Sequence, residues 1–374
     1  MTETSAAAGA YLRELSAKRP AYPLEARSKY IPSLDGLRAV SILIVIASHV
    51  GLHNLVPGGF GVTVFFFISG FLITRLMFAE VERSGRLSLP RFYTRRFLRL
   101  APALLLMILV TGLLISPWLD SVPRQEILAS IFYYANYYIY YHPDLHLPIR
   151  ALWSLAIEEH YYLAYPFLFA LLVRKPGRLL VLLVGLCIAA LVWRVILIYG
   201  LGVPSDMPDP AMPYTYLATD CRVDSILFGA ILSVLCQMPR GQALIRRLAN
   251  WPTFLAATAV LLASFAARDS EFRETLRYSI QSAALFVLVA SCLFGVQFGL
   301  FRKILEVGPM LWIGKISYSL YVWHLAVVSL MKWHFAGGAT WQWALASLPL
   351  IVAVAALSYY GVERPVAAVR ARLH

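Results

Sequence analysis

The sequence predicts an all-α, polytopic membrane protein, a bundle of about ten transmembrane helices. Of its 374 residues, 60% are hydrophobic and 14% are charged, whereas about 25% of the residues in a soluble domain are charged. The mean hydropathy is +0.68, and apolar runs long enough to cross a bilayer recur along the chain. The net charge of +13 fits the Lys and Arg of cytoplasmic loops, so no nucleic-acid partner is expected.

The predicted spans are ten apolar stretches separated by short polar loops. They lie near residues 35–54, 59–80, 97–117, 151–173, 178–199, 220–238, 251–268, 278–300, 312–332 and 341–361. A further segment, 127–141, is short and rich in tyrosine, a residue that favours the membrane–water interface. We therefore expect 118–150 to be an outside loop on the membrane surface.

The distribution of basic residues predicts the orientation of these spans. With the N-terminus in the cytoplasm, the inward loops hold fourteen Lys and Arg and the outward loops hold five, as the positive-inside rule requires. Both termini are then cytoplasmic, with tails at 1–30 and 367–374 around one transmembrane domain at 31–366. No cleavable signal peptide is evident. The four cysteines form no CxxC pair, so neither a disulfide nor a metal site is expected.

The first span carries charged residues at both ends of an apolar run, SLDGLRAVSILIVIASH. At 100° per residue, the eleven steps from Arg38 to His49 put both side chains on one helix face, about 16 Å apart along the axis. Asp35 lies one turn before Arg38 and can pair with it. Ionisable groups in a span normally face the bundle interior or a water-filled cavity. The alternatives are interfacial residues at a helix end and a hydrogen-bonded interior histidine.

The segment ALWSLAIEEHYYLAYP carries a polar stripe on an otherwise apolar helix. Ser154, Glu158, Tyr161 and Tyr165 recur at i, i+4, i+7 and i+11, the spacing of one helix face. Glu158 and Glu159 cannot both face lipid, so at least one is expected to line a cavity. The alternative is that this segment is the end of a span near the outer membrane surface, where its polar residues contact water.

Two later segments also place polar residues at helical spacing. These cavity candidates are Asp220, Arg222 and Asp224 in DCRVDSILFG, and Ser317, Tyr321 and His324 in ISYSLYVWH. The alternative for the first segment is an ion pair at a helix start. The alternative for His324 is an ordinary buried histidine.

Arginines cluster at the start of the third span, in PRFYTRRFLRLAP. Arg95, Arg96 and Arg99 lie within five residues, and Arg96 and Arg99 are one helical turn apart. Such a pair suits a phosphate group. The alternative is a topology signal or an anchor for anionic lipid head groups.

Together and in this order, these segments resemble acyltransferase family 3, a family of integral membrane proteins. The family's arginine, ten residues and histidine match Arg38 and His49; its two third-span arginines match Arg96 and Arg99. The family's Ser-Leu-x-x-Glu stretch is matched by SLAIE, which favours Glu158 over Glu159. FFFISGFL, DCRVDSILFG, ISYSLYVWH and VERP also look like family landmarks. One departure is that the proline many members have soon after the Trp-His pair is missing from WHLAVV.

The resemblance implies a stand-alone O-acyltransferase of the bacterial cytoplasmic membrane. It implies acetyl-CoA or another acyl-CoA as donor, a hydroxyl of a cell-surface glycan or related glycosylated acceptor, and no metal. His49 is then expected to be the base or to carry the acyl group, with Glu158 or Asp35 assisting and Arg38 offsetting negative charge. Arg96, Arg99 and the adjacent Arg95 are then expected to bind the phosphates of coenzyme A.

A transporter or flippase is the alternative function, because buried His, Glu and Arg also form proton relays. Transporters often show inverted repeats, and no internal repeat is visible in this sequence. A purely structural membrane scaffold would explain none of the buried charge.

Overall fold

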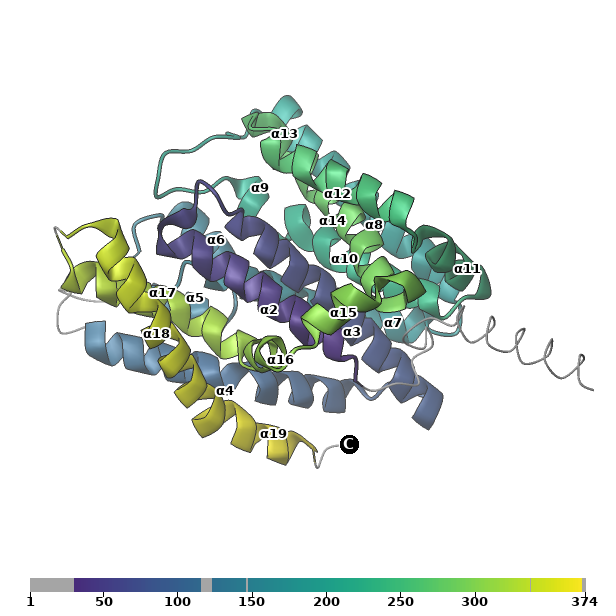
Figure 1. Ribbon diagram of the computed structural model, residues 1–374, viewed down its shortest axis with the longest axis horizontal. Coiled ribbons are helices and arrows are strands. Elements are labelled where there is room, and N and C mark those ends of the chain that lie inside the picture. Colours follow the sequence, from purple (N-terminus) through teal and green to yellow (C-terminus); the bar gives the residue numbers. More distant parts are fainter. Residues whose placement is uncertain (1–29, 116–122, 146, 337, 372–374) are drawn as a thin grey trace, which may run out of the picture.

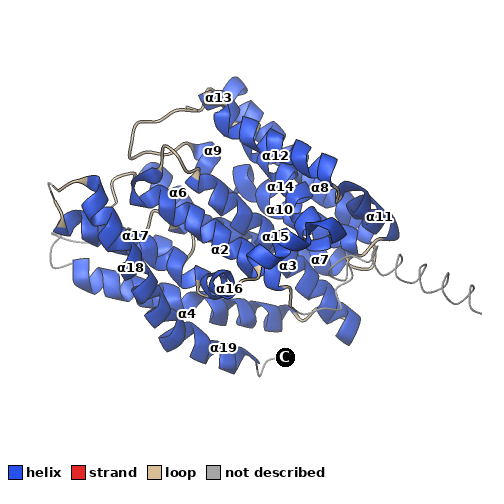
Figure 2. Ribbon diagram, viewed as in Figure 1, coloured by secondary structure: helices blue, strands red, loops and turns tan. Residues whose placement is uncertain are grey.

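The computed structural model of this chain describes residues 30–371 except 116–122, 146 and 337. All regular structure in the described part is helical, with no strand (Figure 2). The predicted all-α class is therefore confirmed. The predicted N-terminal tail lies almost wholly outside the described residues, and so do the last three residues of the C-terminal tail.

The first half of the chain supplies the helices that surround the candidate site. They are α2 (Pro32–Ala47), the π-helix η1 (Ser48–Leu52), α3 (Gly58–Ser84), α4 (Leu89–Ile115), α5 (Arg124–Ile131), α6 (Ala135–Tyr141), α7 (Leu152–Leu172), α8 (Pro176–Val195) and the π-helix η3 (Ile196–Gly200).

The second half adds helices on both sides of this group. They are α9 (Tyr214–Leu217), α10 (Thr219–Cys236), α11 (Pro239–Leu248), α12 (Trp251–Ala266), α13 (Ser270–Glu274), α14 (Arg277–Phe294), the 3-10 helix η4 (Val296–Phe298), α15 (Gly299–Leu305), α16 (Gly308–Lys315), α17 (Ser317–His334), α18 (Thr340–Ser358), the π-helix η5 (Tyr359–Glu363) and α19 (Arg364–Ala371). In Figure 1, α8, α10, α12 and α14 lie together on one side of α2 and α3, and α4, α17 and α18 lie on the other.

Several helices are long and apolar enough to cross a membrane, which makes this an integral membrane protein. Six meet the requirement within the described residues, at Pro32–Leu52, Gly58–Ser84, Leu89–Leu113, Pro176–Gly200, Arg277–Phe294 and Thr340–Arg370. Tyr214–Cys236 together with Pro239–Leu248 makes a seventh if this pair, bent by 115°, is one span.

The predicted count of about ten spans is therefore not confirmed. The stretches at 151–173, 251–268 and 312–332 are helical but are not among these spans. Glu158 and Glu159 interrupt the apolar surface of α7, and α12 has only 16 residues. The stretch at 312–332 is divided between α16 and α17 at Ile316. The tyrosine-rich segment forms two short helices, α5 and α6, and no span, in line with the prediction.

The centre of the bundle is the crossing of α3 and α10, which make the most extensive contact between any two helices. Two glycines lie at this crossing. A Cβ atom on Gly70 would lie 1.9 Å from the carbonyl oxygen of Ile226, and one on Gly229 would lie 1.9 Å from that of Phe67. Small residues let helix backbones approach closely in membranes, so these glycines set the separation of α3 and α10.

Replacing Gly229 by alanine should therefore destabilise the bundle. The added methyl group can be accommodated only if two backbones move apart, and overpacking of this kind costs about 1–3 kcal/mol or more. We expect a lower midpoint of thermal unfolding for the purified protein in detergent. Gly112 in α4 is the matched control, because a Cβ there meets no atom within 4 Å; an equal loss of stability in both alanine variants would contradict the close approach.

The first span does not continue as a regular α-helix to its end. After Ala47 it becomes the π-helix η1, which contains His49. Gly51 has φ of +102°, a conformation open to glycine and rare for other residues, and this residue turns the chain toward α3. The expected α-helical geometry from Arg38 to His49 therefore holds only as far as Ala47.

Candidate active site

A narrow cavity lies where α2, α3, α4, α7 and α17 meet, and we call it the arginine cavity. Its volume is about 70 Å³. Its polar lining comes from Arg38, Ser69, Arg96, Arg99, Ser154, Glu158, Tyr162, Ser317, Tyr318 and Tyr321, and its apolar lining from Val62, Phe65, Phe66, Ile68, Leu100 and Leu155. Seven residues named in the sequence analysis therefore meet here: Arg38, Arg96, Arg99, Ser154, Glu158, Ser317 and Tyr321.

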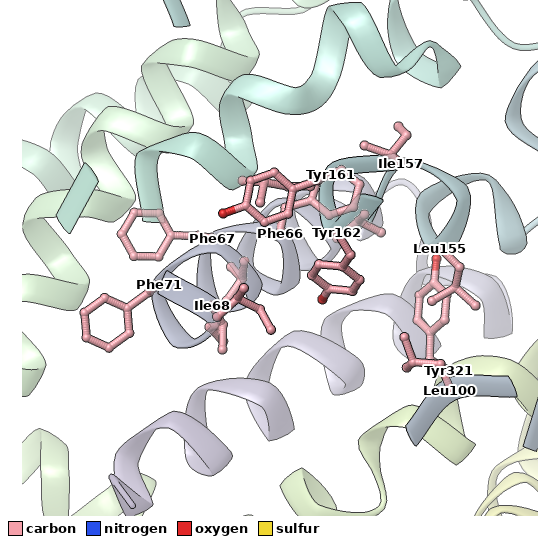
Figure 3. Packing of buried hydrophobic residues seen from close by; sticks show 14 of the residues in the cluster. Phe66, Phe67, Ile68, Phe71, Leu100, Leu155, Ile157, Tyr161, Tyr162 and Tyr321 are labelled. Carbon is pink, nitrogen blue, oxygen red and sulfur yellow. The ribbon is translucent and has the colours of Figure 1, made fainter. Parts of the chain in front are cut away.

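Several of the lining side chains can be followed in Figure 3. Phe66 and Ile68 extend from α3, and Tyr162 extends from α7 beside them. Leu100, Leu155 and Tyr321 lie together in the same view. These side chains come from α3, α4, α7 and α17, four of the helices that line the cavity.

Arg38 is held in place by its own helix. Its Nη1 lies 3.3 Å from Oδ1 of Asp35, one turn earlier, and this is the pair that the spacing predicts. The other oxygen of Asp35 accepts a hydrogen bond of 2.9 Å from the Tyr30 hydroxyl. Asp35 does not line the cavity, so its place in the structure is that of an anchor for the Arg38 guanidinium.

Glu158 is the carboxylate of this cavity, and Glu159 does not line it. Oε2 of Glu158 accepts a hydrogen bond of 3.1 Å from the Tyr162 hydroxyl, which is itself hydrogen-bonded to Ser69. Neither Tyr162 nor Ser69 was predicted from the sequence as a site residue. The signal for Tyr162 was its position four residues after Glu158, which brings the two side chains together on a helix.

The charge of the cavity is dominated by arginine. Three guanidinium groups line it with one carboxylate, and no ion pair within 4.0 Å joins Glu158 to any of them in the described structure. The Arg96 guanidinium lies 5.7 Å from the ring centres of both Phe92 and Tyr162. A low-dielectric wall with an excess of cationic groups attracts anions, so this cavity suits a ligand that carries or develops negative charge.

Arg95 is placed differently from its neighbours. Its Nη2 lies 2.5 Å from Oε2 of Glu80 in α3, and its side chain does not line the cavity. The structure therefore does not bring Arg95 together with Arg96 and Arg99.

The two predicted histidines lie against each other. The ring centres of His49 and His324 are 5.0 Å apart at an interplanar angle of 61°. Nδ1 of His49 is 2.8 Å from the carbonyl oxygen of Val45, and Nδ1 of His324 is 2.6 Å from that of Tyr321. Because a carbonyl oxygen only accepts, both Nδ1 atoms carry a proton. In the neutral form, each Nε2 is then an unprotonated nitrogen that can take up a proton.

Tyr321 joins the histidine pair to the arginine cavity. Its hydroxyl donates a hydrogen bond of 2.8 Å to the carbonyl oxygen of Ala151 and is 2.6 Å from Oγ of Ser154. Its ring lines the cavity, and its centre is 5.5 Å from that of His324. His49 itself does not line the cavity, and ring contacts connect it through His324 to Tyr321, which does.

The segment around Arg222 does not line the arginine cavity. Asp224 forms a buried ion pair of 2.9 Å with Arg194, and Asp220 accepts a hydrogen bond of 2.5 Å from the Trp193 indole. These two carboxylates connect α10 to α8 and do not line the arginine cavity. Their position fits the structural alternative given above, an ion pair near a helix start.

Arg222 is fully buried and has no carboxylate within 4.0 Å among the described residues. One Nη donates a hydrogen bond of 3.2 Å to Thr63, while Nε and the other Nη have no hydrogen-bond partner. Its guanidinium is surrounded by aromatic rings at centre distances of 3.8 to 5.9 Å, those of Tyr278, Tyr216, Trp153 and Phe66. Stacking on aromatic faces compensates for part of the cost of burying this cation.

Comparison with known proteins identifies the family. A family model described as an acyltransferase domain matches residues 31–360, which includes every helix that lines the cavity. The chain belongs to this acyltransferase family. The resemblance stated from the sequence motifs is thus confirmed over nearly the whole chain.

Two relatives of the chain have names that specify an acetyltransferase. Peptidoglycan O-acetyltransferase OatA of Listeria monocytogenes is 32% identical over 356 residues, which is 90% of this chain and 56% of the relative. O-acetyltransferase OatA of Staphylococcus aureus is 29% identical over 371 residues, 90% of this chain and 57% of the relative. The chain thus spans a little more than half the length of these relatives. No solved structure matches it significantly.

No group of three or more His, Cys, Asp or Glu side chains in the described residues is arranged to hold a metal ion. The four cysteines are buried and unpaired. The polar side chains that line the arginine cavity are arginine, glutamate, serine and tyrosine.

Proposed function

We propose that this protein is a membrane-bound O-acyltransferase that moves an acetyl group from acetyl-CoA to a hydroxyl of a glycan. The observation that carries the proposal is the arginine cavity, where Arg38, Arg96 and Arg99 lie around Glu158 and Tyr321 leads to two histidines. Acyl transfer to an alcohol needs these two functions: a base for the hydroxyl proton and positive charge for the oxyanion.

The reaction can be written with the groups present. The acceptor hydroxyl oxygen attacks the thioester carbonyl carbon, so that a C–O bond forms and the C–S bond breaks. Nε2 of His49 takes the hydroxyl proton and passes it to the thiolate of coenzyme A. If His49 carries the acetyl group instead, Nε2 first attacks the thioester carbon and displaces the thiolate; the acceptor hydroxyl then attacks the acetyl-imidazole carbon, the C–N bond breaks, and the hydroxyl proton passes to the thiolate. Arg38 offsets the negative charge that develops on the carbonyl oxygen.

The donor is expected to enter from the end of α2 that carries Arg38. The cavity is far smaller than the roughly 300–1,000 Å³ of typical ligand sites, so it can hold only part of a coenzyme A thioester. The phosphates of the donor would then lie near Arg96 and Arg99, since arginine binds phosphate through paired hydrogen bonds. We place this end, with both termini, on the cytoplasmic side of a bacterial cytoplasmic membrane.

The names of the relatives support the class of acceptor. Both are called O-acetyltransferases, and one name specifies peptidoglycan. A peptidoglycan-type glycan is therefore the first acceptor to test, and acetyl is the first acyl group.

Replacing Arg99 by alanine should weaken donor binding. Loss of a charge-assisted hydrogen bond costs about 1.5–3 kcal/mol, which corresponds to a rise in KM for acetyl-CoA of about ten- to a hundredfold. Release of free thiol from acetyl-CoA by the purified protein measures this change. Acetyl-dephospho-CoA lacks the 3′-phosphate. If Arg99 contacts that phosphate, wild type and the Arg99 variant should have the same KM for this donor.

Arg91 is the matched control for this experiment. It lies on the same helix, is exposed, and does not line the cavity. Arg91→Ala should keep the wild-type KM. Equal KM values for the Arg99 and Arg91 variants would contradict a donor site at the arginine cavity.

A further inference from the structure

A second, wider cavity of about 650 Å³ lies at the other end of α2, and we call it the loop cavity. It is formed by the segment 53–60 after η1, the segment 205–216, and the residues around α13 and the start of α14. Its exposed lining residues, such as Leu55 and Arg273, show that it opens to the surface. Its volume lies within the roughly 300–1,000 Å³ of typical ligand sites.

The loop cavity lies close to both parts of the candidate active site. Ser48, the residue directly before His49, lines it. Tyr216 and Tyr278 also line it, and their other neighbour is the buried guanidinium of Arg222. Since Arg222 also contacts Phe66, which lines the arginine cavity, a wall of one guanidinium and its aromatic neighbours separates the two cavities. His49 follows Ser48 in the chain, and its ring contacts His324.

The lining of the loop cavity has a definite chemistry. It combines aromatic faces with polar groups, and its formal charges balance. The lining contains three arginines and three carboxylates: Arg268, Arg273, Arg277, Asp206, Asp209 and Glu274. Glu274 is already engaged, because it accepts hydrogen bonds of 2.7 Å from Thr215 and from Tyr278.

Such a lining selects neither an anion nor a cation. Guanidinium groups only donate hydrogen bonds and carboxylates only accept them, whereas a hydroxyl group does both. A ligand with many hydroxyl groups and an apolar face matches this mixture of donors, acceptors and aromatic rings. A sugar has both features.

We propose that the loop cavity binds a sugar unit of the glycan acceptor and presents its hydroxyl toward His49. This inference rests on the proposed function and specifies where its acceptor binds. The donor and the acceptor then approach from opposite ends of α2 and meet beside His49, next to the wall around Arg222.

The first test measures binding without catalysis. Ala211 lines the cavity, and the four native cysteines are buried, so Ala211→Cys adds one accessible thiol to the purified full chain in detergent. We expect the disaccharide GlcNAc–MurNAc and the neutral dimer of GlcNAc to slow its reaction with a maleimide. Arg124→Cys, an exposed position outside both cavities, should react at the same rate with and without sugar.

The outcomes of this labelling experiment are distinct. Protection of Ala211→Cys by both sugars supports the site. Failure of both sugars to slow labelling would overturn it, and so would equal protection by citrate, which would show that the cavity selects charge.

The second test separates acceptor binding from donor binding. Arg273→Ala removes an exposed donor of the loop cavity, and loss of one charge-assisted hydrogen bond should raise KM for the disaccharide about tenfold or more. The KM for acetyl-CoA should stay unchanged, and Arg124→Ala should change neither constant. An Arg273 variant with a wild-type KM for the disaccharide would contradict the proposal.

These results distinguish the inference from the proposed function. If wild-type protein releases no thiol from acetyl-CoA, the proposed function fails whatever the labelling shows. If thiol release is normal and sugars give no protection, the proposed function stands and the loop cavity is not the acceptor site.

Discussion

Replacing His49 by alanine should lower the rate of acetyl transfer by about a hundred- to ten-thousandfold, the contribution of a general base. The reason lies in the tautomer of the ring. Nδ1 of His49 donates to the Val45 carbonyl, which leaves Nε2 free to accept the proton of the attacking hydroxyl. The measurement is the transfer of labelled acetyl from acetyl-CoA to GlcNAc–MurNAc by the purified protein, with kcat and both KM values determined.

A matched variant tests whether this effect belongs to the site. His334 is an exposed histidine near the end of α17, and His334→Ala should keep the wild-type rate. A thermal unfolding curve for His49→Ala shows whether the variant remains folded. A folded His49 variant that transfers acetyl at the wild-type rate would exclude His49 as the base or the acyl carrier.

Replacing Arg38 by alanine should lower kcat by about a hundred- to thousandfold, because removal of a preorganised group that stabilises an oxyanion has an effect of this size. The KM for acetyl-CoA should change little, since charge on the carbonyl oxygen develops only in the transition state. This split between kcat and KM separates Arg38 from Arg99, for which the reverse pattern is expected.

Two further variants refine the assignment of Arg38. Arg38→Lys retains the positive charge and should recover part of the lost rate. Asp35→Asn removes the negative charge that pairs with Arg38 at 3.3 Å but retains the arginine itself, so we expect a smaller loss than for Arg38→Ala. A rise in KM with unchanged kcat for Arg38→Ala would show that Arg38 binds the donor and has no special contact with the transition state.

The parts of this site that depend on one helix could be read from the sequence. The spacing of Asp35 and Arg38 predicts their ion pair, and the stripe through Ser154 and Glu158 predicts a polar face that lines a cavity. Both inferences depend only on the repeat of the α-helix.

The parts that depend on contacts between helices could not be read in this way. Arg95 is one residue from Arg96 in the sequence, yet it pairs with Glu80 across the turn between α3 and α4. His49 lies in a π-helical turn, which a pattern of apolar residues does not reveal. The loop cavity is built from segments as far apart in the sequence as Ser48 and Gln281, and no local motif marks it.

The number of spans could not be predicted from the sequence for a similar reason. Apolar stretches identified most of the helices, but a run of apolar residues does not state where a helix bends or ends. The chain bends by 115° between Tyr214–Cys236 and Pro239–Leu248, and the helices α16 and α17 are divided at Ile316. The predicted stretch at 312–332 therefore contains parts of two helices.

The most direct test of the central claim is the transfer of labelled acetyl from acetyl-CoA to GlcNAc–MurNAc by the purified wild-type protein in detergent, where no gradient exists. Acetyl transfer predicts that labelled, base-labile ester accumulates on the sugar in step with the release of free thiol. The opposite result would be that acetyl-CoA stays intact, the sugar stays unlabelled, and a substrate moves only across the membrane of sealed vesicles. That result would contradict the proposed acetyltransferase activity and indicate a transporter.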